Sequence, residues 1–118
     1  MDTNATYFPI AFDNNGSFTI INNGTAAAPC RLIVIPPNDV MEMTITGLSD
    51  EPIVVARVTR NTILVIDGIN HQVTKDGVSA FDDYDAWEFP RLVPGENKIS
   101  ITDGASASIS IEYQPRYI

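Results

Sequence analysis

The sequence predicts an all-β protein of about eight or nine short antiparallel strands, arranged as a sandwich or a barrel. Three observations support this fold class. Apolar and polar residues alternate with a period of two in several stretches. Asn-Gly, Asp-Gly and Pro-Gly pairs separate these stretches at short intervals, and such pairs favour tight turns. No segment shows a sustained helical period of about 3.6 residues, so helices are not expected.

Three stretches alternate regularly enough to predict strands with one buried and one exposed face. In MEMTIT (residues 41–46), two methionines and an isoleucine alternate with glutamate and threonine. The same pattern occurs at residues 99–102 and, with serines at the polar positions, at 106–113. Successive side chains of a strand point to opposite faces, so each pattern indicates a half-buried strand.

Three other runs are apolar at consecutive positions and are rich in valine and isoleucine. They lie at residues 32–35, 53–58 and 63–66, and turn residues bound each of them. Short apolar runs of this kind are typical of central strands. We expect them to be covered on both faces, or to be covered on one face and bound by a partner on the other.

The strands and turns together fit one domain preceded by a short lead-in. We expect strands at residues 17–21, 30–35, 41–48, 53–58, 62–67, 71–74, 86–89, 97–102 and 106–113. Residues 1–16 are less regularly patterned and are expected to be a lead-in segment, which leaves a single β-sandwich domain at 17–118. A chain of 118 residues is long enough to bury a core without help from a metal or a disulfide.

Composition and charge exclude several classes of function. The formal net charge is −8 and the seven basic residues are scattered, so neither nucleic acid nor an anionic membrane surface is an expected partner. No run approaches the length of a membrane helix, about 18 apolar residues. The N-terminus lacks the basic start and apolar stretch of a secretory signal. Cys30 is the only cysteine, which rules out an internal disulfide and fits a reducing compartment.

The sequence offers no convincing catalytic, cofactor or metal site. His71 is the only histidine and no nucleophile motif accompanies it, so we expect an ordinary surface or edge residue rather than a general base. Cys30 opens an apolar strand and is expected to be a buried small hydrophobic residue. Zinc-ligand spacing and phosphate-binding glycine loops are absent from the sequence. An enzyme is therefore not expected.

An acidic run provides the one candidate for a metal site. Asp82, Asp83, Asp85 and Glu88 could supply oxygen ligands to calcium, but they lack the spacing of a known calcium loop. Paired carboxylates could also serve glycoside hydrolysis, but the sequence does not set their separation. We expect solvated carboxylates beside a strand and no bound metal.

The stretch YDAWEFPRLVPGENKI (residues 84–99) contains the only tryptophan and is interpreted as a structural motif. Trp87 and Phe89 would share one face of a strand, Pro90 would end it, and Pro94-Gly95 would form a turn. These five residues are expected to close the core. The alternative is a lectin-like module in which Trp87 and Tyr84 stack on a sugar.

The same stretch also resembles a known family. WEFPRLVPGENKI is similar to the near-C-terminal signature of phage distal tail proteins and related siphophage tail components. INNGTAAAPCRLIV resembles the entry into the same domain, and ILVIDGINHQVTKDG resembles its hairpin. The ending EYQPRYI is similar to the family's C-terminus, so the resemblance extends from about residue 18 to 118.

The resemblance implies a galectin-like (jelly-roll) β-sandwich, the C-terminal domain of a distal tail protein. It implies a structural component of the virion tail, assembled in the cytoplasm of the bacterial host, without catalytic residues or cofactors. The implied partners are other tail, baseplate or receptor-binding proteins, with a homo-oligomer also possible. The family's N-terminal belt domain, which forms a hexameric ring, has no counterpart in these residues. We therefore expect an excised fragment or a reduced relative.

Overall fold

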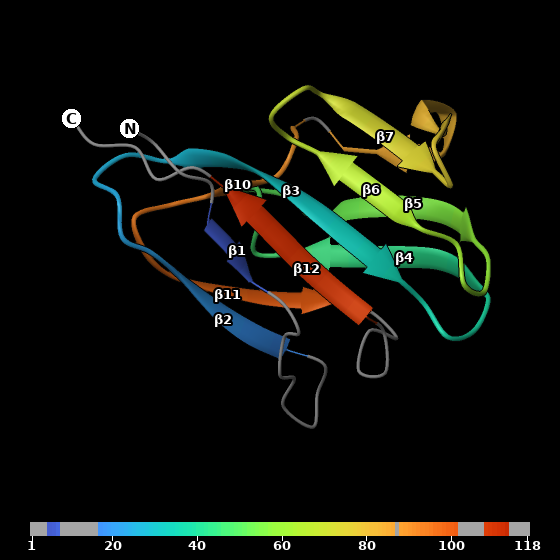
Figure 1. Cartoon of the computed structure of the whole chain (residues 1–118), viewed down its shortest axis with the longest axis horizontal. Coiled ribbons are helices and arrows are strands. Elements are labelled where there is room, and N and C mark those ends of the chain that lie inside the picture. Colours follow the sequence, from blue (N-terminus) through green and yellow to red (C-terminus); the bar gives the residue numbers. More distant parts are fainter. Residues whose placement is uncertain (1–4, 8–16, 87, 102–107, 114–118) are drawn as a thin grey trace.

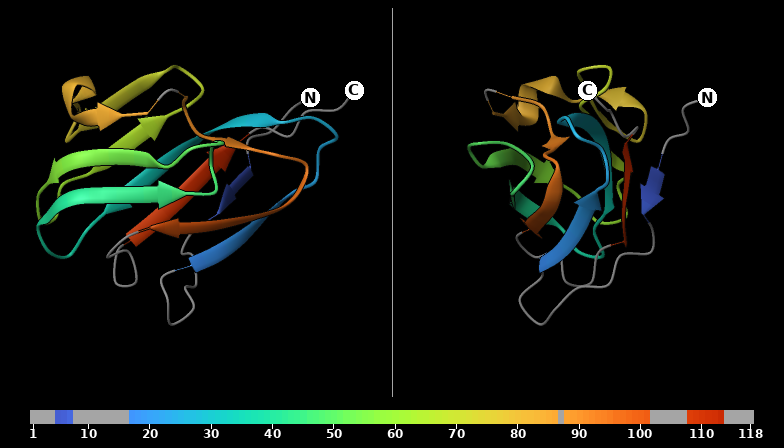
Figure 2. Two further views of the ribbon diagram at one scale, coloured as in Figure 1. Left: turned by 180° about the vertical axis from the view of Figure 1, so that it is seen from behind. Right: turned by 90° about the vertical axis from the view of Figure 1, so that its left-hand side faces the viewer.

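The protein folds into two antiparallel sheets packed face to face. The computed structural model describes residues 5–7, 17–86, 88–101 and 108–113. Within these residues it has twelve strands and one three-residue 3-10 helix, η1 (Phe81–Asp83). The two layers are visible in Figure 2, where β2 (blue) and β11 (orange) lie in one layer and β3 (teal) and β12 (red) in the other. The all-β sandwich expected from the sequence is therefore confirmed.

One layer is a seven-stranded sheet with the order β1-β12-β3-β6-β7-β8, and β10 pairs separately with β3 (Figure 1). Its strands are β1 (Ala5–Tyr7), β12 (Ser108–Tyr113), β3 (Ala28–Ile35), β6 (Leu64–Asp67), β7 (Gln72–Lys75), β8 (Val78–Ser79) and β10 (Arg91–Leu92). β3 lies at the centre, between β12 and β6. Every pairing in this sheet is antiparallel.

The other layer is a five-stranded sheet with the order β2-β11-β4-β5-β9 (Figure 1). Its strands are β2 (Ser17–Asn22), β11 (Gly95–Ile101), β4 (Val40–Thr46), β5 (Ile53–Val58) and β9 (Tyr84–Asp85). Its two edges differ in length, since β2 has six residues and β9 has two.

The core lies between the sheets and follows the period of two seen in the sequence. Buried and half-buried residues alternate along all eight residues of β3. Leu32 and Ile66 from one sheet and Met43 and Ile99 from the other are fully buried. Tyr113 is also buried, and its hydroxyl donates to the carbonyl of Ile21 in the opposite sheet at 3.1 Å. Alternation in the sequence therefore predicted the inward faces of β11 and β12 correctly. In β4 it was correct at Met43 and Ile45, but Met41, which alternates with them, is 79% exposed. For β3 and β6 the sequence indicated only apolar runs, and the structure decides which of their residues face inward.

Eight of the nine expected strands are present, but the strand expected at 86–89 is wrong. Residues 86, 88 and 89 are not in a strand, and Trp87 lies outside the described residues. The reason is topological. β9 pairs with β5 in one sheet, whereas β10 pairs with β3 in the other. The chain therefore changes layers between β9 and β10, and residues 86, 88, 89 and 90 belong to neither ladder.

The apolar runs in β3, β5 and β6 occupy interior positions in their sheets, as expected, but they are not covered on both faces. Ile33, Val54 and Val65 point away from the core and are half-buried. The second expected arrangement, with a core on one face and a partner on the other, stays a prediction.

The structure also contains strands that the sequence pattern did not predict. β1 falls inside the expected lead-in of residues 1–16 and pairs with β12 along three residues. β8, β9 and β10 have two residues each, too short to produce a visible alternation. Among the described residues, the only helical element is η1, so no described helix is long enough to span a membrane.

Candidate interaction surface

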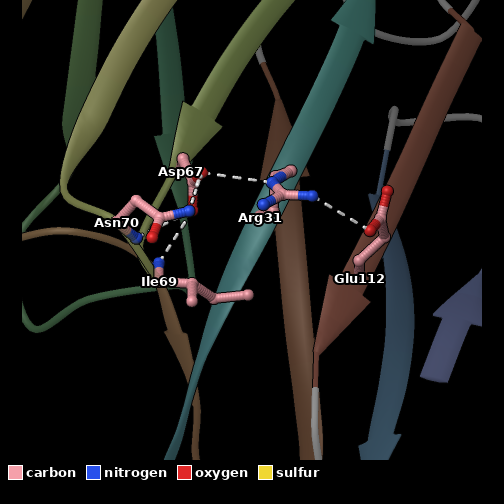
Figure 3. Close-up of polar contacts among 5 residues, drawn as sticks. All are labelled: Arg31, Asp67, Ile69, Asn70 and Glu112. Carbon is pink, nitrogen blue, oxygen red and sulfur yellow. Dashed lines mark hydrogen bonds and ion pairs between the residues drawn. The ribbon is translucent and has the colours of Figure 1, made fainter. Parts of the chain in front are cut away.

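The outer face of the seven-stranded sheet carries a row of charged side chains. Glu112 on β12, Arg31 on β3 and Asp67 on β6 lie side by side because the register pairs Arg31 with both acidic residues. Arg31 Nε lies 3.2 Å from Asp67 Oδ2, and Arg31 NH1 lies 3.2 Å from Glu112 Oε2 (Figure 3). One guanidinium therefore joins three neighbouring strands.

Asp67 also organises the turn between β6 and β7. Its Oδ1 accepts hydrogen bonds from the backbone amides of Ile69 and Asn70 at 2.9 and 3.0 Å. Its Oδ2 accepts from Asn70 Nδ2 at 2.9 Å, in addition to Arg31 (Figure 3). Burial alone would raise the pKa of Asp67, but the hydrogen bonds from Asn70 and Ile69 and the charge of Arg31 together lower it below its usual value.

Next to this row is an apolar area, the β3–β6 patch, which we define as Ile33, Ile35, Ile63 and Val65. Ile33 and Val65 are cross-strand neighbours, and both are half-buried. Ile35 is half-buried two residues further along β3, and Ile63 is 46% exposed just before β6. Branched side chains on a solvent-facing sheet surface are what a contact between proteins requires.

A second polar cluster ties the two sheets together near η1. Lys75 on β7 donates to the carbonyls of Ala56 and Arg57 on β5 at 2.8 and 2.9 Å, and to Asp83 Oδ2 at 2.8 Å. Arg57 donates to the other oxygen of Asp83. The hydrogen bond from Lys75 is the main reason that the pKa of Asp83 is lowered. Asp83 was expected to be a solvated carboxylate, and this expectation is wrong because two cations bind it.

Four aromatic rings pack beside this cluster. Phe89 lies between His71 and Tyr84, with ring centroids 4.9 Å and 5.1 Å apart and both pairs stacked. Phe81 is tilted against Tyr84 and Phe89, at 6.2 and 6.1 Å. Phe89 and Tyr84 are partly or fully buried, whereas Phe81 is 56% exposed. The stack therefore has Tyr84 and Phe89 packed at its base, while Phe81 and His71 are exposed to solvent.

The structure locates most of the residues of the expected core motif. Phe89 packs half-buried against the core, and the buried Pro90 accepts a hydrogen bond at its carbonyl from the amide of Cys30 at 3.1 Å. Pro94 and Gly95 are exposed, and Gly95 has a φ of 90°, which suits the expected turn. Trp87 lies outside the described residues, so its role as a core residue stays a prediction.

The alternative sugar platform depends on Trp87 and Tyr84. Tyr84 is only 8% exposed, its ring stacks on Phe89, and its hydroxyl donates to the carbonyl of Glu88 at 2.6 Å. Burial raises the pKa of this hydroxyl above its usual range. Tyr84 therefore offers no free face for a sugar, and the platform stays a prediction that depends on Trp87 alone.

His71 and Cys30, the remaining candidates for catalytic chemistry, lie in different environments. His71 is exposed just before β7, as expected for a surface residue. Cys30 is fully buried, as expected, and burial raises the pKa of its thiol to about 12. Within the described part of the chain, no group of three His, Cys, Asp or Glu side chains could hold a metal ion.

Sequence reasoning missed the charged row of Arg31, Asp67 and Glu112. Asp67-Gly68 was visible as a turn signal, but nothing local connects residues 31, 67 and 112. Their proximity depends on the register of three strands, which only the folded sheet sets.

Comparison with known proteins provides the family. Residues 23–117 match the siphovirus-type tail component family, C-terminal domain. The chain belongs to this family. The match confirms the resemblance inferred from the sequence, and it makes the protein a structural tail component located in the virion tail.

A solved structure agrees in fold. The crystal structure of the SPP1 Dit (gp 19.1) protein, described as a paradigm of the hub adsorption apparatus in phages that infect Gram-positive bacteria, is similar with a TM-score of 0.70. The identity is 8%, so this similarity supports the fold alone. The match covers 98% of this chain but 46% of the SPP1 protein, so the chain spans about half of that protein. No curated protein sequence matches.

Proposed function

We propose that this domain is a non-catalytic contact module at the tail tip, and that it binds neighbouring tail, baseplate or receptor-binding proteins. The family match carries the assignment to the tail. The proposed contact surface is the β3–β6 patch (Ile33, Ile35, Ile63 and Val65) with its charged border. A second copy of the chain is the simplest partner to test.

The composition of this surface supports the proposal. Apolar atoms at the centre with polar groups at the edge is the usual pattern of an interface between proteins. Here the patch supplies the apolar centre, and Arg31, Asp67 and Glu112 supply a border of satisfied charges. Ser110 on β12, which pairs with Ile33, extends the face with a small side chain. A flat face of this kind suits contact, whereas catalysis uses a concave pocket.

Sedimentation velocity across a wide range of concentrations tests self-association through this face. The informative variant is Val65→Glu, which places a charge in the centre of the patch. The matched control is Val54→Glu, because Val54 is also half-buried on a central strand but lies on the outer face of the other sheet.

We expect wild type and Val54→Glu to form dimers or larger species at high concentration, and Val65→Glu to stay monomeric. Strictly monomeric wild-type protein would contradict homo-oligomerisation. Loss of association in Val54→Glu, but not in Val65→Glu, would place the contact on the opposite sheet. Turnover of an ester, glycoside or phosphoester by the purified chain would contradict the non-catalytic assignment.

A further inference from the structure

A second surface lies at the opposite edge of the sheets from β1 and β2, where the chain crosses from one layer to the other. β8 ends the seven-stranded sheet and β9 ends the five-stranded sheet. Residues 78–85 connect these two edges through η1, and the chain is back in the first sheet at β10. We define the crossover surface as the exposed residues Val78, Phe81, Asp82, Asp85 and Glu88.

The crossover surface combines exposed apolar side chains with packed rings and salt bridges that hold the segment in place. Val78 is 69% exposed and Phe81 is 56% exposed, although Phe81 packs against the partly buried rings of Tyr84 and Phe89. The salt bridges of Asp83 to Lys75 and Arg57 attach η1 to β7 and β5. The backbone of η1 is therefore fixed before binding, and its exposed residues Phe81 and Asp82 lose little conformational entropy when a partner docks, which favours binding.

The charged residues of the segment that carries this apolar area are all acidic. Between Lys75 and Arg91 the sequence has five of the fifteen acidic residues and no basic residue. Asp83 is paired, but Asp82, Asp85 and Glu88 form no ion pair within the described part of the chain. The two cations that contact this segment both bind Asp83.

We propose that the crossover surface docks a positively charged segment of a partner protein, in which arginine or lysine alternates with apolar residues. A cation can lie on the face of Phe81 while a carboxylate neutralises it, and apolar side chains can cover Val78 and the ring edge. Charge complementarity selects this occupant. A second copy of the chain docked through this same surface would place Asp82, Asp85 and Glu88 against their own counterparts, so like charges would repel there.

This proposal is independent of the contact made by the β3–β6 patch. The two surfaces have no residue in common, so Val65→Glu leaves the crossover surface unchanged. Failure of one proposal therefore leaves the other standing.

Fluorescence anisotropy with labelled synthetic peptides tests the docking. The probe is a short peptide of alternating arginine and leucine, and its control has glutamate in place of arginine. Both are titrated with the whole chain at low and high salt. The variants are Phe81→Ala and the double variant Asp82→Asn/Asp85→Asn. The matched control is Glu42→Gln/Glu96→Gln, which removes two exposed carboxylates from the outer face of the five-stranded sheet.

We expect the arginine peptide to bind, and each crossover variant to weaken binding roughly tenfold, since one tenfold step in affinity is about 1.4 kcal/mol. Binding by the matched control should equal that of wild type. The two carboxylate variants should melt at the wild-type temperature, whereas Phe81→Ala loses ring contacts and should melt slightly lower but remain folded at the assay temperature. Equal weakening in the matched control would overturn the proposal, because it would show attraction to the acidic chain as a whole. Absence of binding, or equal binding of the glutamate peptide, would also overturn it.

Discussion

Replacement of Asp67 by asparagine tests how much the charged row of Arg31, Asp67 and Glu112 contributes to the stability of the fold. The Asp67→Asn substitution keeps the size of the side chain and one oxygen, which can still accept from the amides of Ile69 and Asn70. The other oxygen becomes an amide nitrogen, and its hydrogens then point at Arg31 Nε and Asn70 Nδ2, which are also donors. Two accepted hydrogen bonds are lost and two donors are brought together.

The structure sets the magnitude of the effect. Hydrogen bonds to a charged group contribute about 1.5–3 kcal/mol each. Arg31 keeps Glu112, and its side chain is 31% exposed, so water replaces part of the loss. We therefore expect Asp67→Asn to lower the free energy of unfolding by about 2 kcal/mol in total. For a domain of this size that is a fall in Tm of roughly 6–10 °C.

The pH dependence has a defined sign. The pKa of Asp67 is lowered in the folded protein, so the stabilisation is complete above the unfolded pKa of about 3.9 and is lost as the pH falls through the folded pKa. The difference between wild type and Asp67→Asn should therefore be full at neutral pH and should shrink in acid below the ordinary aspartate range.

Urea unfolding at neutral and acidic pH measures this difference, with Asp85→Asn as the control. Asp85 is exposed and forms no ion pair among the described residues, so its replacement should change stability by less than about 0.5 kcal/mol. A loss in Asp67→Asn no larger than in the control would refute the reasoning. A loss that is the same at both pH values would show that shape, and not charge, causes it.

Three further predictions concern packing, the Asp83 cluster and the thiol. Gly68→Ala should strongly destabilise the protein, because the new Cβ would lie 2.3 Å from the carbonyl oxygen of Pro90 and 2.7 Å from that of Cys30. The control Gly77→Ala meets no atom within 4 Å, so it should cost only the strain of its positive φ. Equal losses of stability in thermal melts of the two variants would contradict this. Lys75→Met should lower the free energy of unfolding by about 2–3 kcal/mol, because the carbonyls of Ala56 and Arg57 lose the ammonium donor and Asp83 keeps only Arg57; an unchanged urea midpoint would show that water replaces the ammonium. Cys30 should react with a thiol reagent only after unfolding, because burial raises its pKa to about 12; rapid labelling of the native protein would disagree.

The local pattern of the chain was sufficient to predict the strands that form the core. Alternation identified the buried faces of β11 and β12, and of β4 at Met43 and Ile45, because a half-buried strand must place every second side chain in the core. Met41 alternates with these two residues but is 79% exposed. The same reasoning failed at residues 86–89. Trp87 and Phe89 are two residues apart and were expected to share one face of a strand, but Phe89 is not in a strand, because the chain changes sheets between β9 and β10.

The candidate surfaces were less predictable than the core. The sequence indicated that the apolar runs at 53–58 and 63–66 exceed what one core can hide, and Val54 and Val65 are indeed half-exposed. It did not indicate which of them would share a face with Ile33, because that depends on which strands become neighbours. Asp83 was misjudged for a related reason. Its two cations lie eight and 26 residues earlier in the chain, on strands of different sheets.

The sequence by itself determined the fold class, the inward faces of β11, β12 and most of β4, the absence of an internal disulfide and the likeness to phage tail proteins. These properties depend on local period, on composition and on the order of short motifs. Only the tertiary structure decided the strand order, the short strands β8 to β10, the Arg31–Asp67–Glu112 row and the crossover surface. The physical reason is that these features depend on sheet register and on contacts between residues distant in the chain, whereas a period of two specifies only which way each side chain points.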